Sequence, residues 1–154
     1  VLDPSTNELF EAHLGQGATC NGNPIHVNDQ LPFAKEGPRI TYNLTYNYAD
    51  PQEASRVFAR LTGQPGDFDL YRNTNSFGVN LCHVACGRYD GVVALTKDAF
   101  PEVAGGLILR EAGGVFTTFA GAPRIRPSDR RFLGGSRRVH KALHEALINE
   151  RLPE

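Results

Sequence analysis

The sequence contains no methionine among its 154 residues, so residue 1 is not a translation start. We therefore expect the chain to be a piece of a longer protein. It also contains no apolar run near the roughly 20 residues that a membrane-spanning helix needs. Its first residues, VLDPSTNE, are polar and do not resemble a signal peptide. These absences predict a protein without a membrane partner.

An excess of charge of one sign is also missing. The 16 basic and 17 acidic residues give a formal net charge of −1, which does not favour a nucleic acid or an anionic membrane as a partner. Hydrophobic residues make up 40% of the chain and charged residues 21%, as is typical of an ordinary globular protein. The length is sufficient for one domain with a real core, which we expect to span residues 1–154.

Cysteine is scarce, and the number of cysteines is odd. Cys82 and Cys86 stand four positions apart in an apolar stretch, and Cys20 lies far from them in the sequence. This spacing suits two small buried residues in a reducing compartment, so we predict a cytoplasmic protein. A zinc site would need more ligands than this stretch offers.

Residues 1–37 predict strands and a loop. Two apolar-bearing runs, Glu8–His13 and Pro24–Val27, flank the turn-rich sequence GQGATCNGN, whose glycines give the backbone freedom to turn. We expect a β-hairpin or meander followed by a loop that extends to residue 37. This segment is predicted to belong to a second, separate sheet.

Residues 38–154 predict an alternating series of strands and helices. In RITYNLTYN, Ile40, Tyr42, Leu44 and Tyr46 share one face, which indicates a strand with one buried face. Further strands are predicted near 68–70 and at 92–95, 114–119 and 131–136, and helices at 50–63, 76–87, 101–112 and from the cap residue Ser136 onward. Such alternation favours an α/β fold, a layered mixed β-sheet with helices on both faces. Ligands of such folds gather at strand ends near helix amino termini.

Four stretches of the sequence match known motifs in order and rough spacing: NELFEAHLGQGATCNGNPIHV, RNTNSFGVNLCHVACGRYDG, FPEVAGGLILREAGG and RFLGGSRRVHKALHEAL. The second resembles Arg-x-x-Gly-Ser-Ala-Ala-x-x-Leu-Cys-x-Val-Ala-x-Gly-x-x-Asp-Gly. The third resembles Trp-Asp-x-Ala-Ala-Gly-x-x-Ile-x-x-Glu-Ala-Gly-Gly. The chain thus resembles the carboxyl-terminal portion of the inositol monophosphatase family, which contains lithium-sensitive, Mg²⁺-dependent phosphomonoesterases.

The resemblance implies hydrolysis of a small phosphate monoester of an inositol, a sugar or a nucleotide. In that chemistry Mg²⁺ ions held by carboxylates activate a water and neutralise charge on the phosphate. The implied partner is a small phosphorylated substrate, with no nucleic acid or membrane, and the family implies a homodimer as one form of assembly. The family's leading half, with its Gly-Glu and Asp-Pro-x-Asp-Gly-Thr motifs and most metal ligands, has no counterpart here, because Asp3-Pro4 continues as Ser-Thr.

The family's anion-holding turn predicts a phosphate site in this chain. Its Gly-Ser-Ala corresponds to Asn75, Ser76 and Phe77. The N–H groups of these residues stand at a predicted helix start, where they are expected to bind the substrate phosphate. A helix cap is an equally good interpretation of Ser76.

The family's metal-binding segment is altered here. Its Trp-Asp pair corresponds to Phe100-Pro101, so a proline replaces the aspartate. The nearest acids, Asp98 and Glu102, are the remaining candidate metal ligands. Glu102 is better explained by its favourable interaction with the helix dipole, and Asp98 by a turn. The family's substrate-binding acid, three residues after Asp-Gly, corresponds to Ala94.

Other polar residues have simpler interpretations. Arg72 suits an ion pair better than an anion site. His140 and His144 stand four positions apart beside Lys141, and a solvent-exposed helix face explains them better than a metal does. A cluster of basic residues lies in the segment 124–141: Arg124, Arg126, Arg130, Arg131, Arg137, Arg138 and Lys141. We interpret it as a solvated edge, with an anionic partner as the alternative.

Two functions remain open. The chain is either part of a Mg²⁺-dependent phosphatase, with little activity by itself because two-metal chemistry needs several converging acids, or a non-catalytic binding or assembly module. The replacements at Ala94 and Pro101 favour the module. Both hypotheses depend on one geometric prediction: the helices within 76–87 and 103–114 are buried, and their amino ends face one shared hollow.

Overall fold

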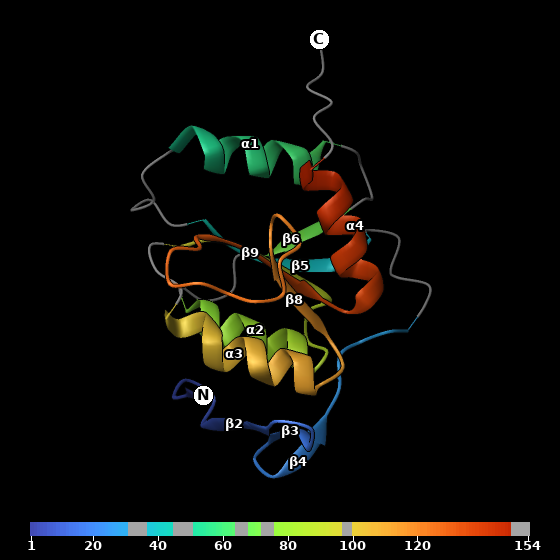
Figure 1. The fold of residues 1–154 in the computed structure, drawn as a ribbon. Coiled ribbons are helices and arrows are strands. Elements are labelled where there is room, and N and C mark those ends of the chain that lie inside the picture. The colour runs from blue at the N-terminus through green and yellow to red at the C-terminus, as the bar shows by residue number, and fades with distance from the viewer. Residues whose placement is uncertain (31–36, 45–50, 64–67, 72–75, 97–99, 149–154) are drawn as a thin grey trace.

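The protein is described here by a computed structural model, which covers residues 1–30, 37–44, 51–63, 68–71, 76–96 and 100–148, without the side chains of residues 100–102. Four layers follow one another (Figure 1). Helices α1 and α4 cover one face of a sheet, helices α2 and α3 cover its other face, and a second sheet lies beyond α2 and α3. The predicted α/β architecture, with helices on both faces of a mixed sheet, is confirmed.

The strands and helices largely follow the predicted series. In chain order the strands are β1 Leu2–Asp3, β2 Glu8–His13, β3 Gly17–Cys20, β4 Asn23–Ile25, β5 Arg39–Leu44, β6 Asp69–Tyr71, β7 Gly91–Leu95, β8 Val115–Thr118 and β9 Arg131–Gly135. The helices are α1 Pro51–Thr62, α2 Phe77–Ala85, α3 Phe100–Glu111 and α4 Arg137–Ile148.

The two sheets differ in topology. β1 to β4 form an antiparallel meander, in the order of the chain. The larger sheet has the order β6-β5-β7-β9-β8, in which β6, β5 and β7 are parallel and β9 is antiparallel to both of its neighbours. The parallel strands therefore end at one common edge, where ligands gather in folds of this kind.

The first sheet corrects one detail of the sequence prediction. The sequence GATC, predicted as part of a turn, forms strand β3. The turns are confined to its two sides, where Gly15 and Gly22 adopt positive φ values of 75° and 78°. β3 is a strand because Ala18 is buried in the core and pairs with both Ala12 and Ile25. Tertiary packing here overrides a composition typical of a loop.

Strand β5 corrects a second detail. We expected one buried and one polar exposed face, but Thr41 and Asn43 are buried as well as Ile40. The reason is the layered architecture, since a strand with helices on both faces has no solvent-facing side. The predicted residues after Leu44, and the proposed cap of α1 at Asp50, lie outside the described part of the chain.

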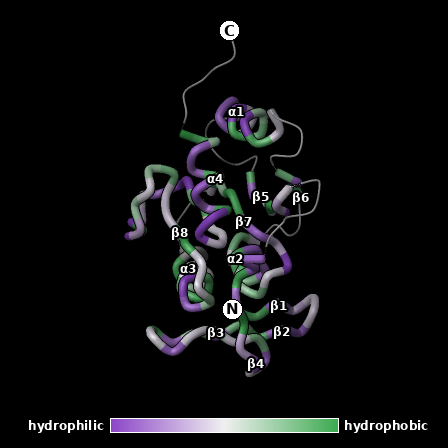
Figure 2. The backbone as a smooth tube through the Cα atoms, turned by 90° about the vertical axis from the view of Figure 1, so that its right-hand side faces the viewer, coloured by the Kyte–Doolittle hydropathy of each residue, from purple (hydrophilic) through white to green (hydrophobic). Residues whose placement is uncertain are grey.

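The core has two parts, one on each face of the larger sheet. In β7, Val92 and Ala94 join the cluster beneath α2 and α3, whereas Val93 and Leu95 join the cluster beneath α1 and α4. This alternation follows from the two-residue period of a strand. Figure 2 shows hydrophobic colour along β7, whereas α1, at the outside, carries both hydrophilic and hydrophobic residues.

A serine precedes each of the helices α2 and α4. Ser76 precedes α2 and accepts a hydrogen bond from the Val79 N–H at its side-chain oxygen, which confirms the cap. Ser136 precedes α4, and its carbonyl accepts from the His140 N–H at 2.8 Å. Ser136 therefore occupies the predicted cap position, although its hydroxyl has no hydrogen-bond partner among the described residues. Within the described part of the chain, no helix has the length and apolar character that crossing a bilayer requires.

Candidate functional site at the amino ends of α2 and α3

Helices α2 and α3 lie side by side between the two sheets (Figure 1). They approach closely because Gly105 has no side chain: an added Cβ there would lie 3.0 Å from the carbonyl oxygen of Gly78. Their carboxyl ends meet the same segment, since the Val27 N–H donates to the Ala112 carbonyl and Gly87 lies beside His26. The two helices therefore point the same way.

Their amino ends lie where the parallel strands end. Phe77, the first residue of α2, stacks on Phe132 with ring centroids 6.0 Å apart. Phe132 pairs in register with Ala94, the last residue but one of β7. Helix α3 begins at Phe100, soon after the end of β7. Both helix starts thus lie at one edge of the sheet, and their backbone N–H groups make this edge the candidate anion site. The shared hollow expected between them stays a prediction.

The start of α2 contains two of the three predicted phosphate-binding residues. Ser76 is exposed, and its backbone is extended, with φ −97° and ψ 109°. Its hydroxyl accepts from the Val79 N–H at 3.4 Å. The Phe77 side chain is only 4% exposed and packs between Phe116 and Phe132. The side chain of Phe77 thus belongs to the core, and the backbone of Phe77 is the part that can contribute to the candidate site. Asn75 lies outside the described residues, as does Arg72.

The start of α3 contains the altered metal position. Pro101 and Glu102 fall in the first turn of the helix, where a proline costs no hydrogen bond and an acid complements the helix dipole. The side chains of both residues lie outside the described part of the chain, and so does all of Asp98. The structure therefore leaves both candidate metal ligands as predictions.

Ala94 shows what replaces the family's substrate-binding acid. It is fully buried beneath α2 and α3 in the core cluster that contains Phe77 and Phe132. The neighbouring Asn43, its register partner on β5, is 8% exposed. An acid at residue 94 would have to leave this apolar cluster to reach a ligand.

Mg²⁺ does not fit the described residues of this edge. Mg²⁺ binds through carboxylates, water and phosphate oxygens. Pro101 offers no side-chain oxygen in the position of the family's aspartate, and Ala94 offers none in the position of the other acid. Glu53, a carboxylate of α1, forms an ion pair with Arg131 of β9. The described residues of this edge are thus equipped to hold an anion rather than a metal.

The opposite end of α2 carries polar residues that the sequence did not single out. Asp90, from the Asp-Gly motif, is buried and accepts hydrogen bonds from the Arg39 N–H at 2.8 Å and from Asn28 Nδ2 at 2.7 Å. It also pairs with the Arg39 guanidinium. Asp90 therefore fixes the start of β5 to the loop after β4. Arg88 binds the carboxylate of Glu8 through both of its terminal nitrogens.

A group of three residues lies next to this pair. Asp3, Glu8 and His83 each offer one oxygen or nitrogen atom, and these atoms lie within 4.8 Å of one another. The sequence analysis missed the group, because His83 lies some 75 positions from the two acids along the chain. The available signal was the pair of acids in DPSTNE at the start of a predicted hairpin.

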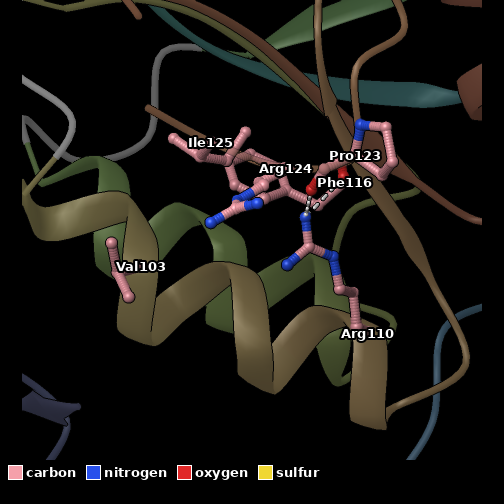
Figure 3. A pocket seen from close by; sticks show the side chains of 6 residues that line it. All are labelled: Val103, Arg110, Phe116, Pro123, Arg124 and Ile125. Carbon is pink, nitrogen blue, oxygen red and sulfur yellow. Dashed lines mark hydrogen bonds between the residues drawn. The ribbon is translucent and has the colours of Figure 1, made fainter. Parts of the chain in front are cut away.

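A groove of about 440 Å³ lies between α3 and the segment after β8 (Figure 3). Val103, Phe116, Pro123 and Ile125 make it mainly apolar. Arg110 donates to the carbonyls of Phe116 and Pro123, and its guanidinium lies 5.5 Å from the ring centroid of Phe116. Burial lowers the pKa of Arg110. Arg110 thus joins α3 to this segment, and the lining residues that the structure describes include no acid or nucleophile for catalysis.

The two histidines of α4 correct a prediction. His140 and His144 are half-buried rather than solvent-facing, and their rings stack with centroids 6.1 Å apart. His140 Nε2 lies 2.8 Å from the Thr117 hydroxyl of β8. Burial, followed by the nearby His144, lowers the pKa of His140. The two histidines do lie on one face of the helix, as their spacing predicted. This face, however, packs against β8 and the turn that follows it, where Gly121 lies beside His144.

The basic segment is partly neutralised. Arg131 pairs with Glu53, Lys141 lies 3.8 Å from Glu145, and Arg130 donates to the carbonyls of Pro127 and Asp129. Arg124 and Arg126 are exposed. The interpretation as a solvated edge agrees with these contacts, and an anionic partner remains an untested alternative.

Comparison with known proteins bears on this geometry. The inositol monophosphatase family matches residues 1–152 of the chain. Among curated proteins, the Nus factor SuhB of Pasteurella multocida is 34% identical over 121 residues, which is 79% of this chain and 44% of that protein. SuhB of Xylella fastidiosa is 30% identical over 157 residues, 97% of this chain and 54% of that protein. The chain thus spans about half the length of the curated relatives it matches.

Solved structures agree in fold. The inositol monophosphatase from Anabaena (Nostoc) sp. PCC 7120 superimposes with a TM-score of 0.79 at 30% identity, covering 95% of this chain and 56% of that one. The extragenic suppressor protein suhB from Bartonella henselae gives a TM-score of 0.78 at 23% identity, covering 97% and 56%. The second likeness is one of fold alone.

Proposed function

Since this chain belongs to the inositol monophosphatase family, we propose that it forms the phosphate-holding part of a Mg²⁺-dependent phosphatase. The substrate is a small phosphate monoester of an inositol, a sugar or a nucleotide. One observation carries the proposal: α2 and α3 begin at the same sheet edge and point the same way. Backbone N–H groups in the first turn of a helix are suited to bind an anion, and two such helix starts at one edge can act on the same anion.

The local charges support an anion at this edge. The first turn of each helix carries the positive end of its dipole. The N–H of Phe77 stands ahead of the first internal hydrogen bond of α2, which the Asn80 N–H donates to the Ser76 carbonyl at 3.1 Å. Ser76 adds a hydroxyl that is exposed. These groups are held rigidly, because Phe77 is anchored in the core.

Mg²⁺ enters the proposal through the family. When bound in such enzymes it activates water and neutralises the charge that develops on the phosphate and the leaving oxygen. By the family resemblance, most of its ligands belong to the half that this chain does not match. The contribution of this chain is to bind and orient the phosphate. Glu102 and Asp98 are the acids of this chain that we propose as secondary metal contacts.

A charge introduced at the helix start tests the proposal. Turnover of p-nitrophenyl phosphate and inositol monophosphate is measured with and without Mg²⁺ in the longest available form of the protein. Ser76→Glu places a carboxylate where the phosphate binds, and KM is expected to rise at least about tenfold, equivalent to about 1.4 kcal/mol. Ser128→Glu, in an exposed loop, is the matched control. Equal KM values for the two variants would remove Ser76 from the site.

A non-catalytic module is the second candidate. The replacements Pro101 and Ala94 favour it, because each removes an acid of the family pattern. The similar proteins carry the name Nus factor, so a role in assembly is the form that we propose for this alternative. Phosphate binding without Mg²⁺-dependent turnover of any ester tested would support the module over the enzyme. A cytoplasmic location and a homodimer remain part of either proposal, and sedimentation of the purified protein tests the dimer.

A further inference from the structure

Three side chains with metal-ligand chemistry meet at the carboxyl end of α2, away from the proposed phosphate site. Asp3 ends β1, Glu8 begins β2, and the two are register partners in the first sheet. His83 comes from α2, which packs over that sheet. One oxygen of each acid and one nitrogen of His83 lie within 4.8 Å of one another.

The carboxylate of Asp3 is buried and only half satisfied. Its side chain is 5% exposed. Oδ1 accepts from the Ser5 N–H at 3.0 Å and from the Ser5 hydroxyl at 2.6 Å. Oδ2 accepts no hydrogen bond from any residue that the structure describes, and it points to His83, with Nε2 at 3.4 Å. A buried carboxylate oxygen without a donor is costly unless a cation compensates it.

The His83 ring is poorly suited to be that cation. It is 6% exposed and packs between the rings of Phe10 and Tyr89. Burial, and then the nearby charge of Arg88, lower the pKa of His83, although Asp3 acts in the opposite direction. Burial therefore disfavours the charged form of the ring. A neutral imidazole nitrogen beside a carboxylate oxygen is a common arrangement of metal ligands.

Glu8 is held as an anion beside them. Arg88 forms two hydrogen bonds with its carboxylate, and the Thr6 hydroxyl donates to Oε2 at 2.7 Å. The hydrogen bonds from Arg88 are the main reason that the pKa of Glu8 falls to about 2. The carboxylate is thus ionised and oriented before any ligand arrives. Arg88 and Thr6 are placed as the supporting groups that fix a metal-binding carboxylate.

We propose that Asp3, Glu8 and His83 bind one divalent transition-metal cation between the first sheet and α2, with Zn²⁺ as the appropriate probe. Two carboxylate oxygens and one imidazole nitrogen match the ligands of Zn²⁺, with water completing a tetrahedral site. Mg²⁺ and Ca²⁺ prefer oxygen ligands alone, so the imidazole disfavours them. The carboxylates of Asp3 and Glu8 carry two negative charges, and the guanidinium of Arg88 carries one positive charge. The net charge of this cluster is therefore negative, which favours the binding of a cation.

The site has an opening to solvent. His83 lines a pocket of about 340 Å³ together with Arg39, Tyr71, Arg88 and Tyr89. The side chain of Glu8 is 17% exposed. A metal ion can therefore approach the group from solvent at His83 and Glu8. Once bound, it ties β1 and β2 to α2, and it stabilises the folded state because the unfolded chain has no such site.

Calorimetric titration with Zn²⁺ tests the proposal, with Asp3→Asn and His83→Gln as the variants. We expect one Zn²⁺ per chain in the unmodified protein and at least about tenfold weaker binding in each variant. His13→Gln, an exposed histidine of β2, and Cys20→Ser, a thiol 3.8 Å from Glu8 Oε1, are the controls. Both controls are expected to bind Zn²⁺ as the unmodified protein does.

NMR spectra of the histidine rings in the unmodified protein provide a second test, which does not depend on whether a variant folds. Zn²⁺ is expected to shift the ring signals of His83 at one equivalent and to leave those of His13 unchanged. The proposal is overturned if Zn²⁺ does not bind saturably, if His83 does not respond, or if Cys20→Ser abolishes binding while Asp3→Asn retains it.

Discussion

The two ends of α2 are built differently. At the amino end, Ser76 is exposed, its contact to Val79 is long, and the adjoining loop residues of the family motif are altered. At the carboxyl end, charged side chains lock together: Arg88 with Glu8, and Arg39 with the buried Asp90. The comparison teaches that ion pairs fix the helix at its carboxyl end, whereas packing of the buried Phe77 ring anchors its amino end. The backbone at the amino end lies at the sheet edge where we propose that the ligand binds.

Removal of the Phe77 ring is the largest expected perturbation of the amino end. Phe77 is buried and contacts two other rings, so Phe77→Ala is expected to lower the free energy of unfolding by about 3–5 kcal/mol. Urea denaturation measures the change. Phe58→Ala, at a 42% exposed phenylalanine of α1, is expected to cost much less. Similar losses for the two variants would mean that the core does not anchor the start of α2.

Filling the contact between the two helices is expected to have the next largest effect. An added Cβ at Gly105 lies 2.9 Å from Leu81 Cδ1 and 3.0 Å from the Gly78 carbonyl. Gly105→Val is therefore expected to cost about 1–3 kcal/mol and to weaken phosphate binding, because it separates the two helix starts. Ala104→Val, at the neighbouring exposed position of α3, controls for helix propensity. A loss in Ala104→Val as large as in Gly105→Val would contradict the packing described here.

The ion pair at the carboxyl end is expected to contribute less and to depend on pH. Glu8→Gln is expected to cost about 1 kcal/mol at neutral pH, as for a partly exposed pair. The folded-state pKa of Glu8 is lowered from 4.5 to about 2. Its contribution is therefore complete above pH 4.5 and is lost as the pH falls toward 2. Denaturation curves at several pH values show this as a difference between wild type and variant that disappears in acid.

Glu11 provides the control for that experiment, because it is an exposed acid on the same strand. Glu11→Gln is expected to change stability little, because surface substitutions of this kind usually do. A pH-independent cost of Glu8→Gln would indicate that packing of the side chain, rather than its charge, carries the effect.

The cap at the amino end is expected to make the smallest contribution. The Ser76 hydroxyl accepts from Val79 at 3.4 Å, which is long for such a bond. Ser76→Ala is therefore expected to cost about 0.5 kcal/mol, the low end for an amino-terminal cap. A loss of 2 kcal/mol in thermal or urea unfolding would show instead that Ser76 holds this end of the helix, and the contrast between the two ends would disappear.

The order of strands and helices was predictable because it depends on local patterns. The apolar spacing of α4, the cap at Ser76 and the continuous apolar run of β7 all appear in short windows of sequence. The sequence predictions were wrong where contacts between residues distant in the sequence determine the local structure. β3 forms because Ala18 packs between two neighbouring strands, and Thr41 is buried because helices cover both faces of β5.

The candidate sites divide in the same way. The edge at Ser76 and Phe77 was predictable, since a resemblance marks those positions and α/β folds place helix starts at strand ends. The group at the other end was not, because His83 meets Asp3 and Glu8 only after the first sheet packs on α2. The half-buried state of His140 likewise depends on Thr117, a residue of another strand.

The most direct test of the central claim is a titration of the ¹⁵N-labelled protein with inorganic phosphate, followed by backbone NMR. If the amino ends of α2 and α3 form one anion site, the amide signals of Ser76, Phe77 and Gly78 shift together with those of the first turn of α3, with a single binding constant. If the shifts occur instead at Arg124 and Arg126, or if only one of the two helix starts responds, the shared site does not exist.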